Sequence, residues 1–145
     1  MEVAGQLLGY EVEHSARLGY LHQLRIDAYG AQHCGPRTPA INTVFALNGL
    51  YMFFEHGGSG LDVRTAHTIM ANTRTPWPKL TAPEQVGDLT AYDVYRLAIS
   101  GPRVDEVADL MVAWAEQAWN AWPDTDRDVV RRLTDELVPR RYYRR

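Results

Sequence analysis

Two histidines and a tyrosine from residue 22 to residue 33 are the side chains of this 145-residue chain best suited to acid–base chemistry. If this segment is one helix that advances about 100° per residue, His22, Tyr29 and His33 fall on a single stripe. Leu18 and Ile26 fall on the same side, so the stripe overlaps the apolar face of the predicted helix. The spacing therefore predicts two imidazoles and a phenol that point toward the core or into a cleft.

The next apolar segment, residues 39–56, offers partners for this stripe. Three polar residues interrupt it, and a tyrosine lies close to the face that two of them share: Asn42, Asn48, Glu55 and Tyr51. Buried polar groups need hydrogen-bond partners, because an unpaired one costs free energy. If the two helices pack antiparallel, His22 lies toward Glu55 and His33 lies toward Asn42.

These side chains suit a small enzyme that needs no cofactor. Histidine titrates near neutral pH, and a carboxylate partner fixes its tautomer and raises its pKa. In this interpretation His22 is the base or acid, Glu55 orients it, and Tyr29 and His33 bind or polarise the substrate. The reaction would be a cyclisation, elimination or isomerisation of a small molecule or peptide, as a tailoring step in bacterial specialised metabolism. The predicted substrate-binding residues are Asn48, Tyr51, Gln32 and Trp77.

Two other interpretations stay open. In the first, the protein is a non-catalytic helical module that binds a partner or dimerises, and its buried His/Tyr network is structural. In the second, one histidine binds a metal ion together with ligands from elsewhere. His22 and His33 are 11 residues apart, about 16 Å along a helix axis, so they cannot share one ion. We expect no cofactor, with a metal ion as the alternative.

The remaining reactive residues suggest less. Asp27 falls about 140° from His22, away from the stripe, so we expect a solvated carboxylate. Asp27 and Arg25 would then have structural or supporting roles. Cys34 follows His33, but adjacent residues rarely form a nucleophile–base pair. The chain has no phosphate-binding glycine loop, no H-E-x-x-H and no G-x-S-x-G, so nucleotide-dependent and hydrolase templates find no support.

Helix-starting and helix-stopping residues divide the chain into six or seven helices. We expect helices over about 3–12, 16–32, 39–56, 62–71, ten residues from 90, 107–122, and 124 or 125 to 137. The expected caps are Ser15, Thr38, Asp62, Thr90 with Asp93, and Asp124 or Thr125. No strand pattern is sustained. The sequence therefore predicts an all-α, single-domain helical bundle over residues 1–138, followed by a basic C-terminal tail, 139–145. Its four tryptophans should pack in the core.

The composition is that of one soluble domain. Hydrophobic residues make up 46% of the chain and charged residues 23%, and a single cysteine excludes an internal disulfide. The net charge is -3, and Lys79 is the only lysine among 15 Lys and Arg residues. Outside the tail the arginines are scattered, so we expect no nucleic-acid partner. No signal peptide or membrane span is visible, so we expect a cytoplasmic protein without a membrane partner, for which a homodimer is an option.

The run from His22 to His33 resembles the H-x-x-x-x-D-A-Y-x-x-Q-H signature of an uncharacterised, mainly actinobacterial family. The likeness continues in Glu55-His56-Gly57, in the loop around Trp77 and in Trp119-Asn-Ala-Trp122, and so covers most of the chain. The resemblance supplies no activity. It implies that six residues matter together: His22, Asp27, Tyr29, Gln32, His33 and Glu55.

This chain departs from the family pattern at several positions. It lacks the N-terminal C-x-x-C segment that suggests a small zinc site in many members. Cys34 and Ala46 stand where members often have proline and histidine, and a histidine before the loop tryptophan is also missing. If the family holds a metal on a histidine cluster, this chain has lost part of that cluster.

Overall fold

The computed structural model describes residues 2–14 and 18–143, and every regular element within them is helical. Two short 3₁₀ turns, Gly19–Leu21 and Arg140–Tyr142, accompany seven α-helices in these residues. The helices are α1 (Glu2–Glu13), α3 (His22–His33), α4 (Ala40–His56), α5 (Gly60–Ala71), α6 (Ala91–Ile99), α7 (Val104–Ala121) and α8 (Asp124–Leu137). The predicted all-α, single-domain fold is confirmed. In the described residues no helix is both long and apolar enough to cross a membrane.

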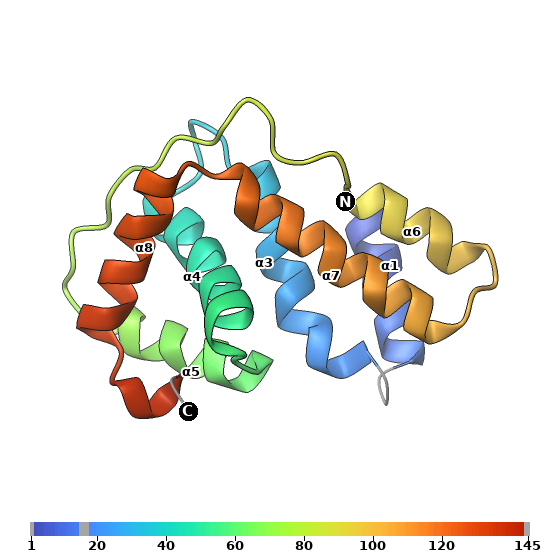
Figure 1. Ribbon diagram of the computed structural model, residues 1–145, viewed down its shortest axis with the longest axis horizontal. Helices are drawn as coiled ribbons and strands as arrows, with labels where there is room; N and C mark the ends of the chain where they lie inside the picture. Colours follow the sequence, from blue (N-terminus) through green and yellow to red (C-terminus); the bar gives the residue numbers. More distant parts are fainter. Residues whose placement is uncertain (1, 15–17, 144–145) are drawn as a thin grey trace.

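Helix α3 lies in the middle of the molecule (Figure 1). It packs against α4 and α7, and α5 contacts both α3 and α4. Helices α1 and α6 pack together near the start of α7, whereas α8 packs against α4 at the other end of the molecule (Figure 1). The helix-free segment 72–90 follows the outer edge of the molecule from α5 to α6. The central helix therefore carries most of the residues that the sequence analysis selected.

Local signals set most helix ends. Gly57 ends α4 with a left-handed φ of 63°, a conformation that favours glycine. Asp93 accepts the backbone N–H of Thr90 at 2.8 Å, as in the capping box predicted for α6. In α5, Ser59 is the N-cap and Asp62 closes the box from inside the helix, so the prediction of Asp62 as the cap is wrong.

Two further caps differ from the prediction. The hydroxyl of Thr38 accepts the N–H of Gly35 at 2.8 Å and does not cap α4, which begins after Pro39. Pro123, and not Asp124 or Thr125, is the residue that precedes α8. In both cases proline supplies a fixed φ at the start of the helix. The predicted cap at Ser15 lies outside the described residues.

Tryptophans of α7 and its C-terminal end form a large part of the core, as predicted. Trp114, Trp119 and Trp122 expose only 0%, 3% and 1% of their surface. A buried indole needs an acceptor for its N–H, and each of the three donates to an acceptor on α3 or α4. The core is therefore held by directed hydrogen bonds as well as by apolar contact.

Small residues allow α3 and α4 to approach closely. A Cβ added to Gly30 would lie 3.1 Å from the Cβ of Ala46, and a Cβ added to Gly49 would lie 1.8 Å from Oδ2 of Asp27. The contacting residues run in opposite directions along the two helices, so the expected antiparallel packing is present. Asp27 is only 3% exposed, so its carboxyl is enclosed against the backbone of α4.

We expect Gly49→Ala to lower the free energy of unfolding by about 1–3 kcal/mol, the usual range for overpacking a core. The added methyl group would collide with the Asp27 carboxyl, which burial leaves without room to move aside. Chemical denaturation measures the change.

Gly9→Ala is the matched control. Gly9 is also inside a helix, but nothing lies within 4 Å of the Cβ it would gain. This substitution should raise stability by about 0.5–1 kcal/mol. Adding Asp27→Ala to Gly49→Ala should recover part of the loss, and a Gly49→Ala protein as stable as wild type would contradict the contact.

Candidate functional site

The stripe of His22, Ile26, Tyr29 and His33 lies on the outer face of α3. Ile26 is 42% exposed and His33 is also exposed, whereas Ala31, on the opposite side of the helix, is 0% exposed. The expectation that this stripe points toward the core or into a cleft is therefore wrong for His22 and His33, whereas Tyr29 is half-buried against the core. We call these four residues the outer face of α3.

Two features of the chain explain the reversed orientation. The 3₁₀ turn Gly19–Leu21 precedes α3, so the buried Leu18 does not continue the register of the stripe. Asp27, about 140° from His22, is only 3% exposed and turns the opposite side of α3 inward, and Arg25, at the flank of the stripe, is only 7% exposed against α1. The expectation that Asp27 is solvated is thus wrong as well.

Glu11 of α1 takes the position beside His22 that was expected for Glu55. Nδ1 of His22 lies 3.6 Å from Oε1 of Glu11, and Nε of Arg25 donates a hydrogen bond to the same oxygen. The side chains of Glu11 and Arg25 are 4% and 9% exposed, whereas that of His22 is 44% exposed. These residues, named here the Glu11 triad, place a half-exposed imidazole over a buried ion pair.

Burial raises the pKa of Glu11, and the charges of Arg25 and His22 oppose part of that rise. Such a carboxylate is costly unless charge partners and hydrogen bonds replace its lost hydration. Oε2 of Glu11 has no hydrogen-bond partner among the described residues. The lost hydration is therefore replaced mainly at Oε1, which accepts the hydrogen bond from Arg25. Glu11 was not among the predicted site residues, although it lies four residues after the buried Leu7 and so shares the inward face of α1.

At the other end of the outer face, Tyr29 and His33 form a stacked pair. Their ring centroids are 3.9 Å apart with an interplanar angle of 27°. Partial burial lowers the pKa of His33, which favours the neutral imidazole. Asn42, expected beside His33, is exposed on α4. This end therefore offers a rigid aromatic surface rather than a charged pair.

The polar residues of α4 find their partners on α8 and not on α3. Asn48 donates to Oγ1 of Thr134 at 2.7 Å. Glu55 accepts two hydrogen bonds from Nε of Arg131, at 3.0 and 3.2 Å, and one from its Nη2 at 2.8 Å. The expected pairing of Glu55 with His22 is therefore corrected: Glu55 binds an arginine of the last long helix and accepts the N–H of Trp119 at 3.2 Å.

Tyr51 belongs to the same contact between α4 and α8. Its hydroxyl donates to Oδ1 of Asp135 at 3.2 Å and bonds with Nε2 of His56 at 2.8 Å. Tyr143 donates to the same oxygen of Asp135 at 2.6 Å and is itself 0% exposed. The basic C-terminal segment thus contributes a tyrosine to the core.

Gln32 and Trp77 hold the long segment 72–90 against the helices. Gln32 donates to the carbonyls of Val86 and Leu89 at 2.9 and 2.8 Å and accepts the N–H of Trp114 at 2.8 Å. Trp77 packs edge-on against Phe45, with ring centroids 5.6 Å apart. The four predicted substrate-binding residues therefore have contacts within the fold, and the structure does not bring them to the outer face of α3.

His67 of α5 is a further imidazole that is largely enclosed by the fold. Its ring stacks on Phe45 and its Nε2 donates to the Phe45 carbonyl at 2.9 Å. Burial lowers its pKa to about 4, so it is neutral at pH 7. No three His, Cys, Asp or Glu side chains within residues 2–14 and 18–143 are placed to hold a metal ion together.

Asp27 is the most enclosed carboxyl of this region. Oδ1 accepts a hydrogen bond from Nε2 of Gln23 at 3.1 Å, whereas Oδ2 has no partner in the described chain and faces Gly49. Burial raises its pKa well above the ordinary value, and the bond from Gln23 offsets only part of the effect. The two buried carboxyls near the start of α3 thus differ in their partners. Glu11 accepts a hydrogen bond from the cation of Arg25, whereas Asp27 accepts one only from the amide of Gln23.

The stability of the protein should depend on pH through Asp27. Its pKa is higher in the folded chain than the ordinary 3.8, so the folded state holds this proton more tightly. The stability that the Asp27 proton contributes to the folded state is complete at low pH. It is lost as the pH rises above about 3.8 toward the raised pKa. Asp27→Asn removes the titration. Urea unfolding between about pH 4 and pH 7 should therefore show wild type losing stability relative to this variant, by at most about 1.4 kcal/mol per pH unit. A pH-independent difference would contradict a protonated Asp27.

The chain matches a protein-family model over most of its length. A family described as "Family of unknown function (DUF5946)" matches residues 1–123. No curated protein and no solved structure matches the chain. The matched residues include the Glu11 triad and the outer face of α3, whereas α8 lies beyond them. Because the match covers most of the sequence, this chain belongs to the DUF5946 family, whose function is unknown.

Proposed function

We propose that this protein is a small enzyme without a cofactor that carries out acid–base chemistry at His22, with Glu11 as the residue that orients the imidazole. The observation that supports this proposal is the Glu11 triad. A half-exposed imidazole has one ring nitrogen beside a buried carboxylate, and a buried arginine fixes that carboxylate. Glu11 replaces Glu55 in the role suggested by the sequence.

The geometry favours one tautomer of His22. If Nδ1 carries the proton and points to Glu11, Nε2 has its lone pair available as a base. No described residue forms a hydrogen bond with Nε2, and the side chain is 44% exposed. The 3.6 Å between Nδ1 and Oε1 is longer than a hydrogen bond, and such contacts often shorten when substrate binds. The substrate would be a small molecule or peptide with a proton that imidazole can remove, as in an elimination or isomerisation.

The rest of the outer face offers contacts for such a substrate. Ile26 is one helical turn from His22 and is 42% exposed, and the Tyr29–His33 stack follows on the same side. An apolar side chain and two aromatic rings can seat a planar or apolar group beside the base. Tyr29 and His33 therefore keep the binding role that the sequence predicted, at a surface and not in a cleft.

A generic proton-transfer substrate tests this proposal. In 5-nitrobenzisoxazole, removal of the ring C–H proton by a base forms the nitrile as the N–O bond breaks, and the nitrophenolate product absorbs visible light. We expect the protein to exceed free imidazole by at least about 10-fold per histidine, because a positioned general base contributes about 10²–10⁴-fold. His22→Gln should remove the excess. Glu11→Asp, which keeps the charge but is one methylene shorter, should reduce it.

His14→Gln is the matched control. His14 is a half-buried histidine directly after α1 whose Nδ1 bonds to the carbonyl of Tyr10 at 3.0 Å and faces no carboxylate in that contact. This variant should keep the full rate. Circular dichroism shows that each variant is folded. A wild-type rate equal to that of free imidazole, or an unchanged rate in His22→Gln, would contradict the proposal.

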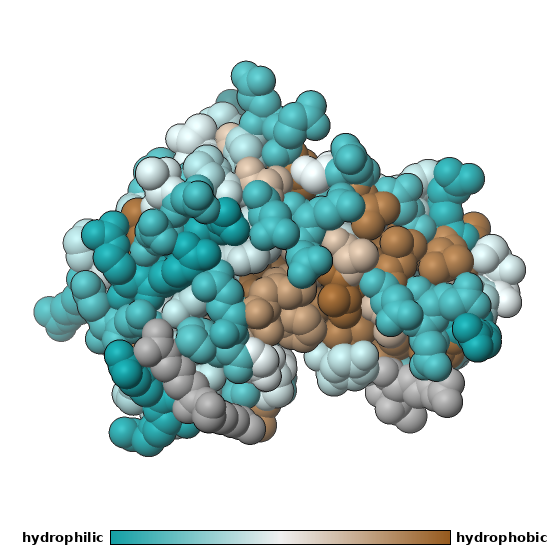
Figure 2. Space-filling model, viewed as in Figure 1, coloured by the Kyte–Doolittle hydropathy of each residue, from teal (hydrophilic) through white to brown (hydrophobic). Residues whose placement is uncertain are grey.

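The exposure of Ile26 favours a second candidate, a dimerising module. Apolar residues gather in the middle of one face of the molecule, where α4 and α7 flank α3 (Figure 2). An exposed isoleucine between aromatic and imidazole side chains is typical of an interface core.

The proposed partner is a second copy of the chain, and sedimentation velocity measures this self-association directly. In this reading Ile26→Asp should weaken self-association at least 10-fold, because it places a charge in an apolar contact. Leu61→Asp is the control, since Leu61 is 65% exposed and belongs to α5 and not to the outer face of α3. A wild-type protein that stays monomeric at high concentration would remove this candidate.

A further inference from the structure

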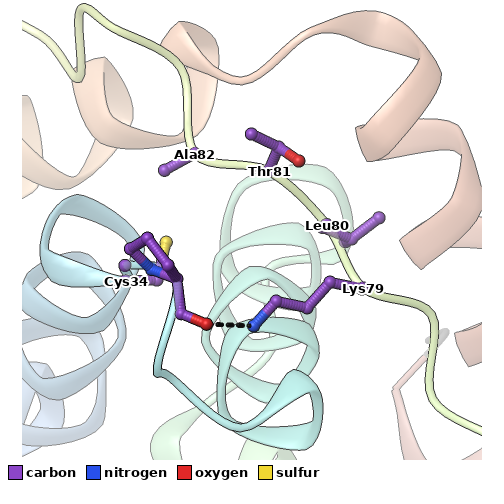
Figure 3. Close-up of a pocket in the computed structure, with 7 residues that line it drawn as sticks. Cys34, Lys79, Leu80, Thr81 and Ala82 are labelled. Carbon is purple, nitrogen blue, oxygen red and sulfur yellow. Dashed lines mark hydrogen bonds between the residues drawn. The ribbon is translucent and has the colours of Figure 1, made fainter.

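A cavity of about 370 Å³ opens between the end of α3 and the segment 72–90. Its walls include Cys34 and Pro36 from the turn after α3, and Lys79, Leu80 and Ala82 from the long segment. Figure 3 shows the thiol of Cys34 pointing toward Ala82 across the cavity, with Lys79 reaching from the segment toward the turn. A volume of this size is within the usual range for small-molecule sites.

Lys79 gives this cavity a positive charge. It is the only lysine of the chain, and its ammonium donates to the carbonyls of Pro36 at 3.2 Å and Thr38 at 2.8 Å. An ammonium has three donors, so two backbone bonds hold it in place and leave one N–H. In the described part of the chain Lys79 forms no ion pair with a carboxylate, and no acidic residue lines the cavity.

The other walls are apolar or neutral. Pro36, Leu80 and Ala82 present hydrocarbon, and burial raises the pKa of Cys34, although the nearby charge of Lys79 opposes this shift. The Cys34 thiol donates to the carbonyl of Ala31 at 3.6 Å. A protonated thiol is a weak nucleophile, so Cys34 acts here as a neutral wall.

We propose that this cavity binds a small carboxylate with an apolar body. The carboxylate would pair with the ammonium of Lys79 at the mouth, and the body would lie against Pro36, Leu80 and Ala82. Cys34 is 12 residues after His22, about 18 Å along a helix axis, so this site is separate from the Glu11 triad. A ligand of about ten heavy atoms in a half-open cavity should bind with a Kd on the order of 1 mM.

The single cysteine makes occupancy measurable, because iodoacetamide can modify only Cys34. Benzoate is the probe, and benzamide is its neutral analogue of the same shape. At constant ionic strength we expect benzoate to slow the alkylation of Cys34 at least threefold, with saturation in the millimolar range. Benzamide should have little effect, because it lacks the charge that pairs with Lys79.

Two variants separate the site from a general effect of anions. Lys79→Met keeps the aliphatic stem and should abolish the protection, expressed as the ratio of rates with and without benzoate. Arg37→Met removes an exposed cation of the same turn that does not line the cavity, and it should keep the protection. Amide shifts of Leu80 and Ala82 in ¹H–¹⁵N spectra report binding independently of the thiol.

The proposal is overturned if benzoate and benzamide protect equally, if neither protects, or if Lys79→Met retains the benzoate effect. Shifts confined to residues outside the cavity would overturn it too. None of these results depends on His22, so the cavity and the proposed acid–base centre are tested independently of each other.

Discussion

The close contact between α3 and α4 fixes the rotation of α3 about its axis, and the placement of every candidate residue depends on that rotation. Gly49 lacks the Cβ that would collide with Asp27, and Gly30 allows the helices to meet at Ala46. With Asp27 facing α4, His22 and Tyr29 lie about 140–160° away from that contact. The same rotation places Arg25 next to Glu11 of α1 and Gln32 next to Trp114 of α7.

Local sequence signals were sufficient for the helices but not for the orientation of α3. Gly57, Thr90 and Asp93 act on neighbouring residues, so their effect is visible in the sequence. The burial of Arg25 depends on a carboxylate 14 residues away, and that of Asn48 on a hydroxyl 86 residues away. A helical wheel shows one helix alone and omits the hydrogen-bonding groups of other helices. It therefore cannot show that such a polar residue is buried. The 3₁₀ turn before His22 added an error in register that residue types alone do not reveal.

Helix α8 explains why the polar residues of α4 resemble a site in the sequence. Asn48, Tyr51 and Glu55 lie on one face of α4, as predicted, and α8 covers that face with hydrogen-bonding side chains. Glu55 raises the pKa of Arg131, whose guanidinium also lies 5.6 Å from the ring centre of Trp119. A polar interface between two helices thus produces the same helical spacing of polar residues as a functional site does. The family match ends at residue 123, before the helix that satisfies them.

The energetics of the Glu11 triad separate it from these structural contacts. The pairs between α4 and α8 lie at a partly exposed edge or join neutral groups, so no charge is fully desolvated there. Oδ1 of the fully buried Asn48 also has no partner in the described chain. Glu11 and Arg25 are both nearly buried, and Oε2 of Glu11 has no partner in the described chain. An apolar pair of similar volume would often be as stable or more stable at such a position. The Glu11 triad therefore holds a nearly buried charged pair, and its proposed role in orienting the half-exposed His22 would use both the charge and the fixed position of this carboxylate.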